Sequence, residues 1–572
     1  MWRVPQMAAQ GPHGIQFEAY RPVVMARNGM VCSGHPLASQ AGISVLQRGG
    51  NAVDAAIATA AALNVVEPNM SGIGGDGFIM IYWKQSGSVQ VVNATGAAPA
   101  AATLEAYRDG IPMKGIRSVS VPGLLAGWLE AHARYGSLAL EQVLEPAISL
   151  AQDGFPVSHR LAEGIAADAS LREFPSSRAI FTRDGRPLQA GELLVQRDLA
   201  ETFRRIAAGG AEEFYRGETA RKIVACSERY GGLLTLEDLA ACRAVWQEPI
   251  STTYRGYTVY EAPPNSSGHV LLQELNLVEL FDLRSLGCNT AASIHLMVEA
   301  KKLAFADREE YLADPDFVDV PIAGLLSKAY ARERARLINL ERAALPGTVR
   351  PGDPGAFQPQ GRPAVTRPGR RASGVRREDT TCFVVADRWG NAVCQLQSLQ
   401  SGFGSGLVAD GTGVLLNNRM TYWHLDPQHV DCLEPGKRVR HTMNPVMVFR
   451  DGRLILALGT PGADTQVQTN LQLITHILDF GMTPVEAVEA PRWRHIQSRM
   501  ESTVPHTAED ALNLEARFSE DTVRGLVLRG HPVQVIGPWA AVGSAMVIQV
   551  DLATGAYWGA ADPRRDGYAI GW

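Results

Sequence analysis

The sequence predicts an α+β protein in which helices and β-strands pack in layers. Residues 123–343 show mainly helical periodicity, with clear helices expected at 124–134, 199–208, 218–228 and 293–313. Extended runs such as Tyr257–Tyr260 interrupt these helices, and strand pairs dominate the chain after residue 379. Because helical and extended segments are mixed in this way, a layered architecture fits better than a helical bundle.

Length and composition are typical of a globular protein with more than one layer or domain. The chain has 572 residues, of which 46% are hydrophobic and 20% charged, and its net charge is −5. So small a charge gives no reason to expect nucleic acid or a membrane surface as a partner. We therefore expect small molecules or further copies of the chain as partners, and no cofactor.

The cysteines and the N-terminus indicate the compartment. The seven cysteines are scattered and include no CxxC pair, which argues against a disulfide framework and against a zinc site. The first 14 residues contain no apolar signal-peptide core, and no run approaches the roughly 20 apolar residues of a membrane helix. These features predict a cytoplasmic protein.

Two helices are expected near the N-terminus. Apolar residues recur at helical spacing over residues 36–48, and the Gly49-Gly50 pair ends this helix. Asn51 can cap a second helix over Ala52–Val66, which is apolar almost all round and is therefore expected to be buried. It ends before Pro68, because proline disfavours helical backbone in the preceding residue.

A glycine-rich loop over residues 71–77 precedes an extended run over residues 78–83. A dinucleotide-binding loop requires the order strand, glycines, helix, whereas here a helix precedes the glycines and a strand follows them. We therefore interpret the loop as a tight packing turn.

Residues 344–379 are expected to form a flexible linker. Pro, Gly and Arg recur there and apolar residues are scarce, so the segment cannot bury enough surface to offset the cost of ordering. The arginines between Arg367 and Arg377 can be interpreted as a nucleic-acid patch. A solvated, protease-accessible tether fits the acidic net charge better.

Beyond the linker the periodicity becomes that of β-structure. Short loops with Gly or Asn separate the members of the strand pairs, and a helix is expected over residues 466–480. The expected strands cover residues 381–386 and 392–399, 446–450 and 454–458, and 546–550 and 556–559.

Thr380 lies at the junction of the linker and the first of these strands. If its hydroxyl attacks the Asp379 carbonyl, an N-to-O acyl shift and hydrolysis of the ester leave Thr380 as a new N-terminus. Its α-amine, with an unperturbed pKa of about 7.7 to 8.0, can then act as the base for its own hydroxyl. The alternative is a Thr380-Thr381 pair that merely starts a strand, as β-branched residues do.

Acyl transfer also needs donors for the oxyanion that develops on the attacked carbonyl. The turn Gly459–Asp464 lies between an expected strand and an expected helix. Backbone N–H groups at a helix start have no intrahelical acceptor, so this turn can supply such donors.

Nine motifs in a fixed order make the chain resemble the γ-glutamyltransferase (glutathione hydrolase) family from about Val31 to the C-terminus. Their number and order are far more specific than any single motif. They are residues 49–55 (GGNAVDA), 64–68 (NVVEP), 71–75 (SGIGG), 121–123 (VPG), 379–381 (DTT), 404–406 (GSG), 415–418 (LLNN), 460–462 (TPG) and 562–564 (DPR).

The resemblance implies an N-terminal-nucleophile hydrolase with a four-layer αββα sandwich, made as a proenzyme and cleaved between Asp379 and Thr380. Residues 1–379 would be the large subunit and residues 380–572 the small subunit. The two would stay together as a heterodimer that can itself dimerise.

The resemblance also implies roles for individual residues. By motif position, Thr380 is the nucleophile and base, and Ser398 is the hydroxyl residue that hydrogen-bonds it. Gly462 and Ala463 match the oxyanion-hole pair, which is usually Gly-Gly in the family. Because a backbone N–H donates, Ala463 can serve if its backbone angles permit.

The substrate pocket departs from the family pattern. The arginine that clamps the glutamyl α-carboxylate is replaced by Thr95, and the aspartate that holds the α-ammonium by Tyr422. Gln400 replaces an asparagine, and His441-Thr442 replaces a Ser-Ser pair. Losing the arginine and the aspartate removes the two charges that recognise an α-amino acid.

These substitutions resemble the oxamate amidohydrolase branch, with which the chain shares Asp-Pro-Gln-His at 426–429 and His-Thr-x-Asn-Pro at 441–445. That resemblance makes Arg419, Arg440 and His441 candidate carboxylate ligands. The alternative is that the arginines are exposed loop charges and that the histidine is a core residue.

The leading hypothesis is an autoprocessed amidohydrolase or acyltransferase that forms an acyl-enzyme on Thr380, with a γ-glutamyl or similar short carboxylated acyl group. An oxamate-type or cephalosporin-acylase-type amidohydrolase without γ-glutamyl specificity is the alternative, and a non-catalytic binding or scaffold homologue is a remote one. A metal site is not expected, because no metal-ligand spacing organises His424, His429, His441 and Asp426.

Overall fold

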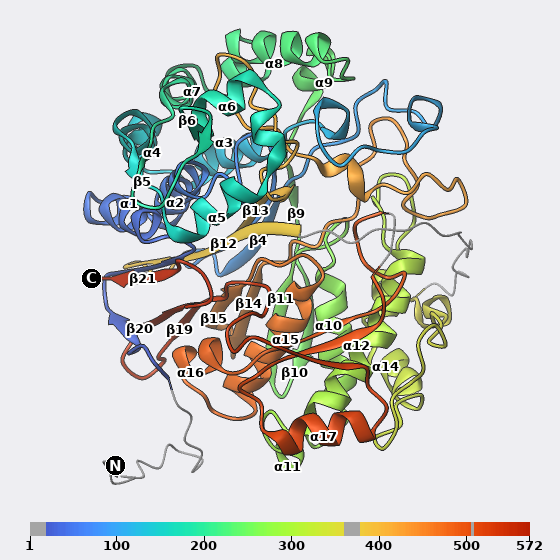
Figure 1. Ribbon diagram of the computed structural model, residues 1–572. Coiled ribbons are helices and arrows are strands. Elements are labelled where there is room, and N and C mark those ends of the chain that lie inside the picture. The colour runs from blue at the N-terminus through green and yellow to red at the C-terminus, as the bar shows by residue number, and fades with distance from the viewer. Residues whose placement is uncertain (1–18, 360–377, 505–507) are drawn as a thin grey trace.

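Within residues 19–359, 378–504 and 508–572, which the computed structural model describes, two seven-stranded antiparallel sheets face each other. Helices cover the outer face of each sheet, so the order of layers is helix, sheet, sheet, helix (Figure 1). The predicted four-layer αββα sandwich is confirmed.

The first sheet contains the strands on either side of Thr380. Both faces of this sheet are buried. Successive residues of a strand point to opposite faces, so each strand contributes side chains to both. In β3, Ile79 and Ile81 pack against the helices, whereas Phe78 and Met80 pack against the other sheet. In spatial order the strands are β21 (Tyr568–Gly571), β2 (Gly29–Ser33), β12 (Glu378–Asp387), β13 (Ala392–Ser401), β3 (Asp76–Trp83), β4 (Ser88–Ala94) and β9 (Val245–Gln247).

The second sheet has the same two-sided pattern. Met447 and Ala457 face the first sheet, whereas Val448 and Leu456 face the helices of the fourth layer. In spatial order its strands are β1 (Val24–Ala26), β20 (Tyr557–Ala561), β19 (Met546–Val550), β15 (Arg453–Gly459), β14 (Val446–Arg450), β11 (Tyr257–Glu261) and β10 (Ile250–Tyr254).

The helices on the first sheet include the two expected near the N-terminus. The second of them is buried along its whole length, and Asn51 caps it with a capping box, as the sequence predicts. The main helices of this layer are α1 (Pro36–Gln47), α2 (Ala52–Val66), α3 (Leu124–Tyr135), α4 (Leu140–Asp153), α5 (His159–Ala167), α6 (Pro175–Phe181), α7 (Arg197–Tyr215), α8 (Glu218–Arg229) and α9 (Leu236–Ala241).

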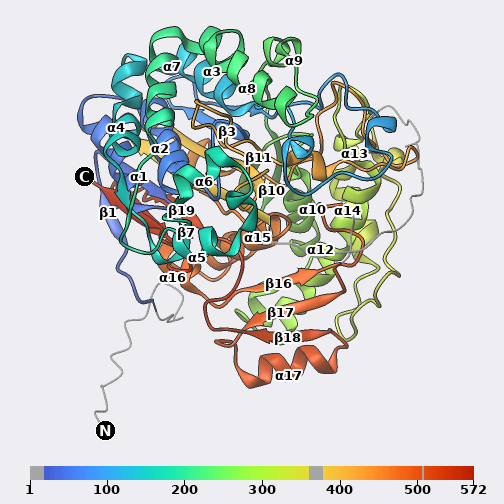
Figure 2. The same cartoon turned by 45° about the horizontal axis from the view of Figure 1, so that its top comes forward.

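The fourth layer covers the second sheet. A small three-stranded sheet and one helix lie at its outer edge (Figure 2). The helices are α10 (Gly268–Val278), α11 (Leu283–Leu286), α12 (Ala291–Tyr311), α13 (Ile322–Leu325), α14 (Lys328–Ala335), α15 (Thr465–Leu478), α16 (Pro484–Glu489) and α17 (Glu520–Leu528), and the strands are β16 (Trp493–Ile496), β17 (Ala511–Glu515) and β18 (Val533–Ile536).

The first part of the expected linker packs on this layer. Gly352 donates its backbone N–H to Asp307 on α12, and Phe357 contacts the ring of Tyr330 on α14. Residues 344–359 are therefore held against helices, a difference from the predicted tether. The cause is a set of polar contacts that composition alone does not reveal. Residues 360–377, which include the basic cluster, lie outside the described residues.

The glycine-rich loop is the tight packing turn that the order of elements predicts. A Cβ at Gly74 would lie 2.2 Å from the Leu415 carbonyl oxygen, and one at Gly75 would lie 2.2 Å from that of Ser398. Only glycine allows so close an approach of two backbones. Among the described helices, none is long and apolar enough to cross a membrane.

Candidate active site

Strand β12 begins before the Asp379-Thr380 junction rather than after it. The sequence predicts a strand from Thr381, but Glu378 already pairs with Ser401 and Asp379 with Gln400 on β13. Pairing with β13, which continues to Ser401, extends β12 backwards across the junction. The junction therefore lies inside the first sheet.

A β-bulge lies opposite the junction. The ladder passes from Asp379 opposite Gln400 to Thr381 opposite Gln397, so β13 has one more residue than β12 over this interval. Gln400 has a φ of +90°, a conformation that side chains other than glycine rarely adopt. Bulges next to active sites redirect side chains, and this one turns Ser398 toward Thr380.

Thr380 and Ser398 are hydrogen-bonded. The Thr380 hydroxyl donates to Ser398 Oγ over 3.2 Å, and the backbone N–H of Gln400 donates to the same Oγ over 2.8 Å. Both hydroxyl residues are buried. The backbone of Gly75 approaches the Ser398 carbonyl oxygen closely, since a Cβ at Gly75 would lie 2.2 Å from it. The sequence pairs these two residues by resemblance, and the structure brings them together.

Two further contacts surround the junction. The Thr381 hydroxyl donates to Glu67 Oε2 over 2.7 Å, at the C-terminal end of α2. Arg565 Nη1, from the turn between β20 and β21, donates to the Thr380 carbonyl oxygen over 3.3 Å. Neither Glu67 nor Arg565 was singled out from the sequence, although each lies in or next to a family motif.

The predicted oxyanion turn connects β15 to α15. Gly462 and Ala463 both have positive φ values, 119° and 49°, so the alanine adopts the left-handed conformation that the motif requires. Among the described residues, neither backbone N–H has a hydrogen-bond acceptor. Two unpaired donors at a helix start can stabilise an anion.

Asp464 anchors this turn from behind. Its buried carboxylate pairs with Arg308 on α12 and accepts hydrogen bonds from the N–H and hydroxyl of Ser502. Burial opposes ionisation, but Arg308 and Ser502 outweigh it and hold the pKa of Asp464 below its usual value. The sequence gives no signal for this pair, because Arg308 falls in a helix far from the turn.

A short segment connects the turn to the junction. Gln400 Nε2 donates to Thr503 Oγ1 over 3.2 Å, and Ser502, the preceding residue, holds Asp464. The two sheets also touch here, because a Cβ at Gly459 would lie 2.7 Å from Cys382 Sγ. The bulge, which the sequence does not predict, and the turn, which it does, are thus joined by direct contacts.

Asp76 lies beside Ser398 on the same face of the first sheet. The two residues are directly opposite in the ladder between β13 and β3, so their side chains are neighbours. Asp76 accepts hydrogen bonds from Arg419 Nε over 3.1 Å and from the Gly96 N–H over 2.8 Å. Burial raises the pKa of Asp76, although Arg419 opposes this rise.

Arg419 brings a positive charge to a position near Thr95. The Thr95 hydroxyl donates to Asn93 Oδ1 over 2.6 Å. The backbone N–H of the next residue, Gly96, donates to Asp76 Oδ1. The Arg419 guanidinium lies over the Tyr422 ring, 4.8 Å from its centroid. Its Nη2 is buried and has no acceptor among the described residues, so it can still bind an anion.

The other candidate carboxylate ligands separate into two places. His441 lies 3.9 Å from Asp76, fully buried, and both its ring nitrogens lack partners in the described residues. Burial and Arg419 lower its pKa well below the usual value, so the ring is neutral. Thr442 is buried beside it, whereas Arg440 points away and donates to Glu309 over 2.7 Å.

Two of the histidines considered for a metal site do meet in space. His424 and His429 stack with ring centroids 3.3 Å apart, and both lie near the Glu309 carboxylate. The Asp431 N–H donates to His429 Nδ1, which places the proton of the neutral ring on Nε2, the atom facing Glu309. A metal ligand would need that nitrogen unprotonated, so this donor set does not suit an ion.

Known proteins resemble the chain over nearly its whole length. Residues 38–572 match the family described as Gamma-glutamyltranspeptidase. The chain is 39% identical over 553 residues to the glutathione hydrolase-like YwrD proenzyme of Bacillus subtilis (strain 168), with 96% of this chain and 99% of that protein covered. It is 38% identical to the acylase ACY 1 proenzyme of Pseudomonas sp. (strain SE83), with coverage of 98% and 96%.

A solved structure gives the same result. The crystal structure of cephalosporin acylase from Bacillus halodurans is 37% identical to the chain and superposes with a TM-score of 0.86, covering 98% of this chain and 99% of that one. Fold, motif order and extent of similarity agree over nearly the whole length. The chain therefore belongs to the gamma-glutamyltranspeptidase family of amide-hydrolysing enzymes.

Proposed function

We propose that the chain is a precursor that cuts itself between Asp379 and Thr380. Thr380 Oγ1 bonds to the Asp379 carbonyl carbon, the peptide C–N bond breaks, and the nitrogen takes the proton that the hydroxyl loses. Water then hydrolyses the ester, giving the Asp379 carboxylate and a Thr380 that carries both a hydroxyl and a free α-amine.

The mature enzyme uses the same hydroxyl on an amide substrate. The bond from Oγ1 to the carbonyl carbon forms while the α-amine takes the hydroxyl proton, and this proton passes to the leaving nitrogen as the amide bond breaks. The Gly462 and Ala463 N–H groups stabilise the oxyanion. Water, or an acceptor amine, then releases the acyl group from Thr380.

The observation that carries the proposal is the hydrogen bond from Thr380 to Ser398 inside the bulged ladder. A threonine that merely starts a strand needs no buried hydroxyl partner and no strained Gln400 opposite the residue before it. Strain of this kind concentrates at functional sites, where surrounding contacts maintain it.

The sheets explain how two fragments would stay together after the cut. Residues 384–387 of β12 and strand β13, which follow the junction, pair with β2 and β3, which precede it. The second sheet mixes its strands in the same way, since β14 pairs with β11. Separation would expose both sheets and the core between them, so the proposed large subunit (1–379) and small subunit (380–572) form one folded unit.

For the acyl group, we propose a short chain that ends in a carboxylate and lacks an α-ammonium. Arg419 supports this specificity, because its Nε binds Asp76, the neighbour of Ser398 in the sheet, while its buried Nη2 has no acceptor among the described residues. Tyr422, where the family has an aspartate, brings no carboxylate to pair with an ammonium group, and the Arg419 guanidinium already lies over its ring.

Hydrolysis of two anilides tests this specificity. Glutaryl p-nitroanilide and γ-glutamyl p-nitroanilide differ only in the α-ammonium, and the first is expected to have the larger kcat/KM by at least tenfold. Arg419→Gln should remove most of this activity and Arg419→Lys should restore part of it, since lysine keeps the charge but not the fork of donors. A preference for the γ-glutamyl compound would refute the proposed specificity.

A further inference from the structure

The C-terminal turn between β20 and β21 contains two adjacent arginines that have different contacts. Residues 562–567 form this turn, and the family motif Asp562-Pro563-Arg564 lies in it. Arg564 is buried, whereas Arg565 is only partly buried. The two side chains make their contacts with different parts of the molecule.

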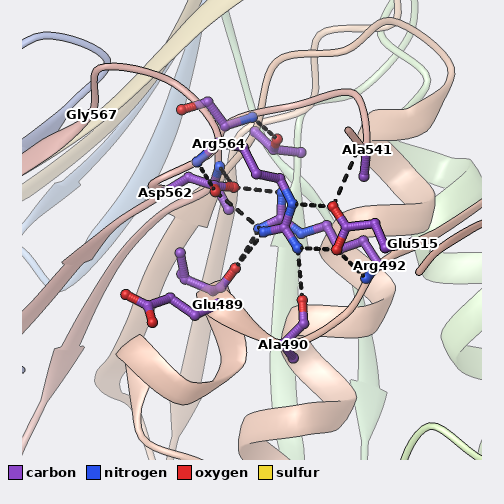
Figure 3. A network of polar contacts seen from close by, with 12 residues as sticks. Glu489, Ala490, Arg492, Glu515, Ala541, Asp562, Arg564 and Gly567 are labelled. Carbon is purple, nitrogen blue, oxygen red and sulfur yellow. Dashed lines mark hydrogen bonds and ion pairs between the residues drawn. The ribbon is translucent and has the colours of Figure 1, made fainter. Parts of the chain in front are cut away.

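Arg564 fixes the turn to the fourth layer. Its guanidinium makes a two-pronged contact with Glu515, at 2.7 Å for each nitrogen, and donates to the Ala490 carbonyl (Figure 3). Asp562 accepts from the Arg564 N–H and pairs with Arg492. A buried network with this many partners leaves the turn little freedom.

Arg565 is thereby presented to the candidate nucleophile. Its Nη1 lies 3.3 Å from the Thr380 carbonyl oxygen and 3.2 Å from Met70 Sδ. The α-nitrogen of any residue lies about 3 Å from its own carbonyl oxygen. A positive charge is therefore held within roughly 6 Å of the nitrogen that would become the α-amine.

We propose that Arg565 keeps the Thr380 α-amine unprotonated near neutral pH, through repulsion between like charges. The inference rests on the proposed function, in which this amine accepts the hydroxyl proton. An unperturbed α-amine is mostly protonated at pH 7, since its pKa is about 7.7 to 8.0. A like charge within about 6 Å lowers such a pKa by about one unit, which makes the base available.

The other charges near Thr380 act in both directions. Glu67, which accepts from Thr381, is the nearest described carboxylate on α2 and favours the protonated amine. Asp76 on β3 is paired with Arg419, so these two largely offset each other. His441 is neutral beside them, and Arg565→Gln removes one positive charge while Glu67 stays in place.

Acylation of Thr380 by p-nitrophenyl acetate tests the inference without knowledge of the natural amide. The burst of p-nitrophenol in the cleaved enzyme is measured from pH 5 to 9, and the midpoint of its acid limb gives the pKa of the amine. Arg565→Gln is expected to move this midpoint up by about one unit, and Arg565→Lys is expected to move it little.

Arg21→Gln is the matched control. Arg21 donates to the Gly567 carbonyl on the same turn over 2.7 Å, and among the described residues no hydrogen bond joins it to Thr380, so its loss should leave the midpoint in place. An unchanged midpoint in cleaved Arg565→Gln would overturn the inference. A burst that is absent from wild type, or that persists in Thr380→Ala, would instead overturn the proposed function.

If Arg565→Gln is not cleaved, Arg565→His supplies the second variant. Its ring is positive at low pH and neutral at high pH, so the pKa of the amine rises as the ring loses its charge and the acid limb should become shallower than that of a single titration. A limb of ordinary steepness with the wild-type midpoint would contradict the role of the charge.

Discussion

Arg308 on α12 forms a fully buried ion pair with Asp464, the residue that follows Gly462 and Ala463 in the candidate oxyanion turn. This pair links α12 to the site, and the remaining hydrogen bonds of the Asp464 carboxylate come from Ser502. The direction of the two turn N–H groups therefore depends on a charge located on another helix.

Asp464→Asn should lower both stability and turnover. The amide keeps the shape but leaves the buried Arg308 without a counter-charge, at a cost of about 3 to 5 kcal/mol. We expect kcat to fall by at least tenfold with a smaller change in KM, as measured by steady-state hydrolysis and by chemical unfolding.

Asp479→Asn is the control for that variant. Asp479 caps the other end of α15 and pairs with Arg255 and Tyr254, away from the turn. The Asp479→Asn variant should be less stable than wild type but should keep the wild-type kcat. Equal losses of kcat in the two variants would mean that helix stability, and not the turn, limits the reaction.

Ala463 offers a test of the turn backbone itself. Ala463 has a φ of 49°, and this backbone conformation is unfavourable for any residue with a β-branched side chain. Ala463→Gly should keep kcat within about twofold of wild type, because glycine accepts this angle. Ala463→Val should lose at least tenfold in kcat while the protein stays folded by circular dichroism; normal turnover in Ala463→Val would argue against an oxyanion role for this segment.

Ser398→Ala removes the hydrogen-bond partner of Thr380. Both the self-cleavage rate and kcat are expected to fall, each by about 10- to 100-fold, which corresponds to the loss of one hydrogen bond at a reacting group. Time-resolved gel electrophoresis and anilide hydrolysis measure the two rates. Ser398→Thr should retain both, and a variant slowed in only one step would separate the two roles.

His35 predicts an acid sensitivity that is independent of the site. Its Nδ1 accepts the Leu37 N–H at the start of α1, and burial lowers its pKa to about 4, against a weaker opposing effect of Asp566. The unfolded chain binds a proton near pH 6.5, so the free energy of unfolding falls as the pH falls from 6.5 to 4.

His35→Asn keeps an acceptor at this cap but cannot bind the proton. The Tm of His35→Asn minus the Tm of wild type should increase steadily as the pH is lowered from 7 to 5 in thermal unfolding. A constant difference across this range would show that His35 does not titrate on unfolding.

The local elements follow well from the sequence. The bounds of α2 and β14 agree residue for residue with the expected ones, because apolar periodicity, a capping asparagine and a following proline act locally. The hydroxyl pair and the oxyanion turn were placed by resemblance, and the turn does connect a strand to a helix.

The supporting contacts could not be obtained in this way. The bulge that strains Gln400 arises from two strands pairing out of step, and the Arg308 pair joins residues more than 150 positions apart. Arg565 looks like any turn arginine until the fold brings it to Thr380. Such contacts depend on tertiary packing, which local patterns do not encode.

The most direct measurement is the intact mass of the purified protein and of its p-nitrophenyl acetate adduct. We predict two fragments, the smaller beginning at Thr380 and carrying the acetyl group on that residue, and a single uncleaved chain for Thr380→Ala. A wild-type protein that remains one chain of 61.7 kDa, or an acetyl group on another residue, would contradict the assignment of Thr380 as nucleophile.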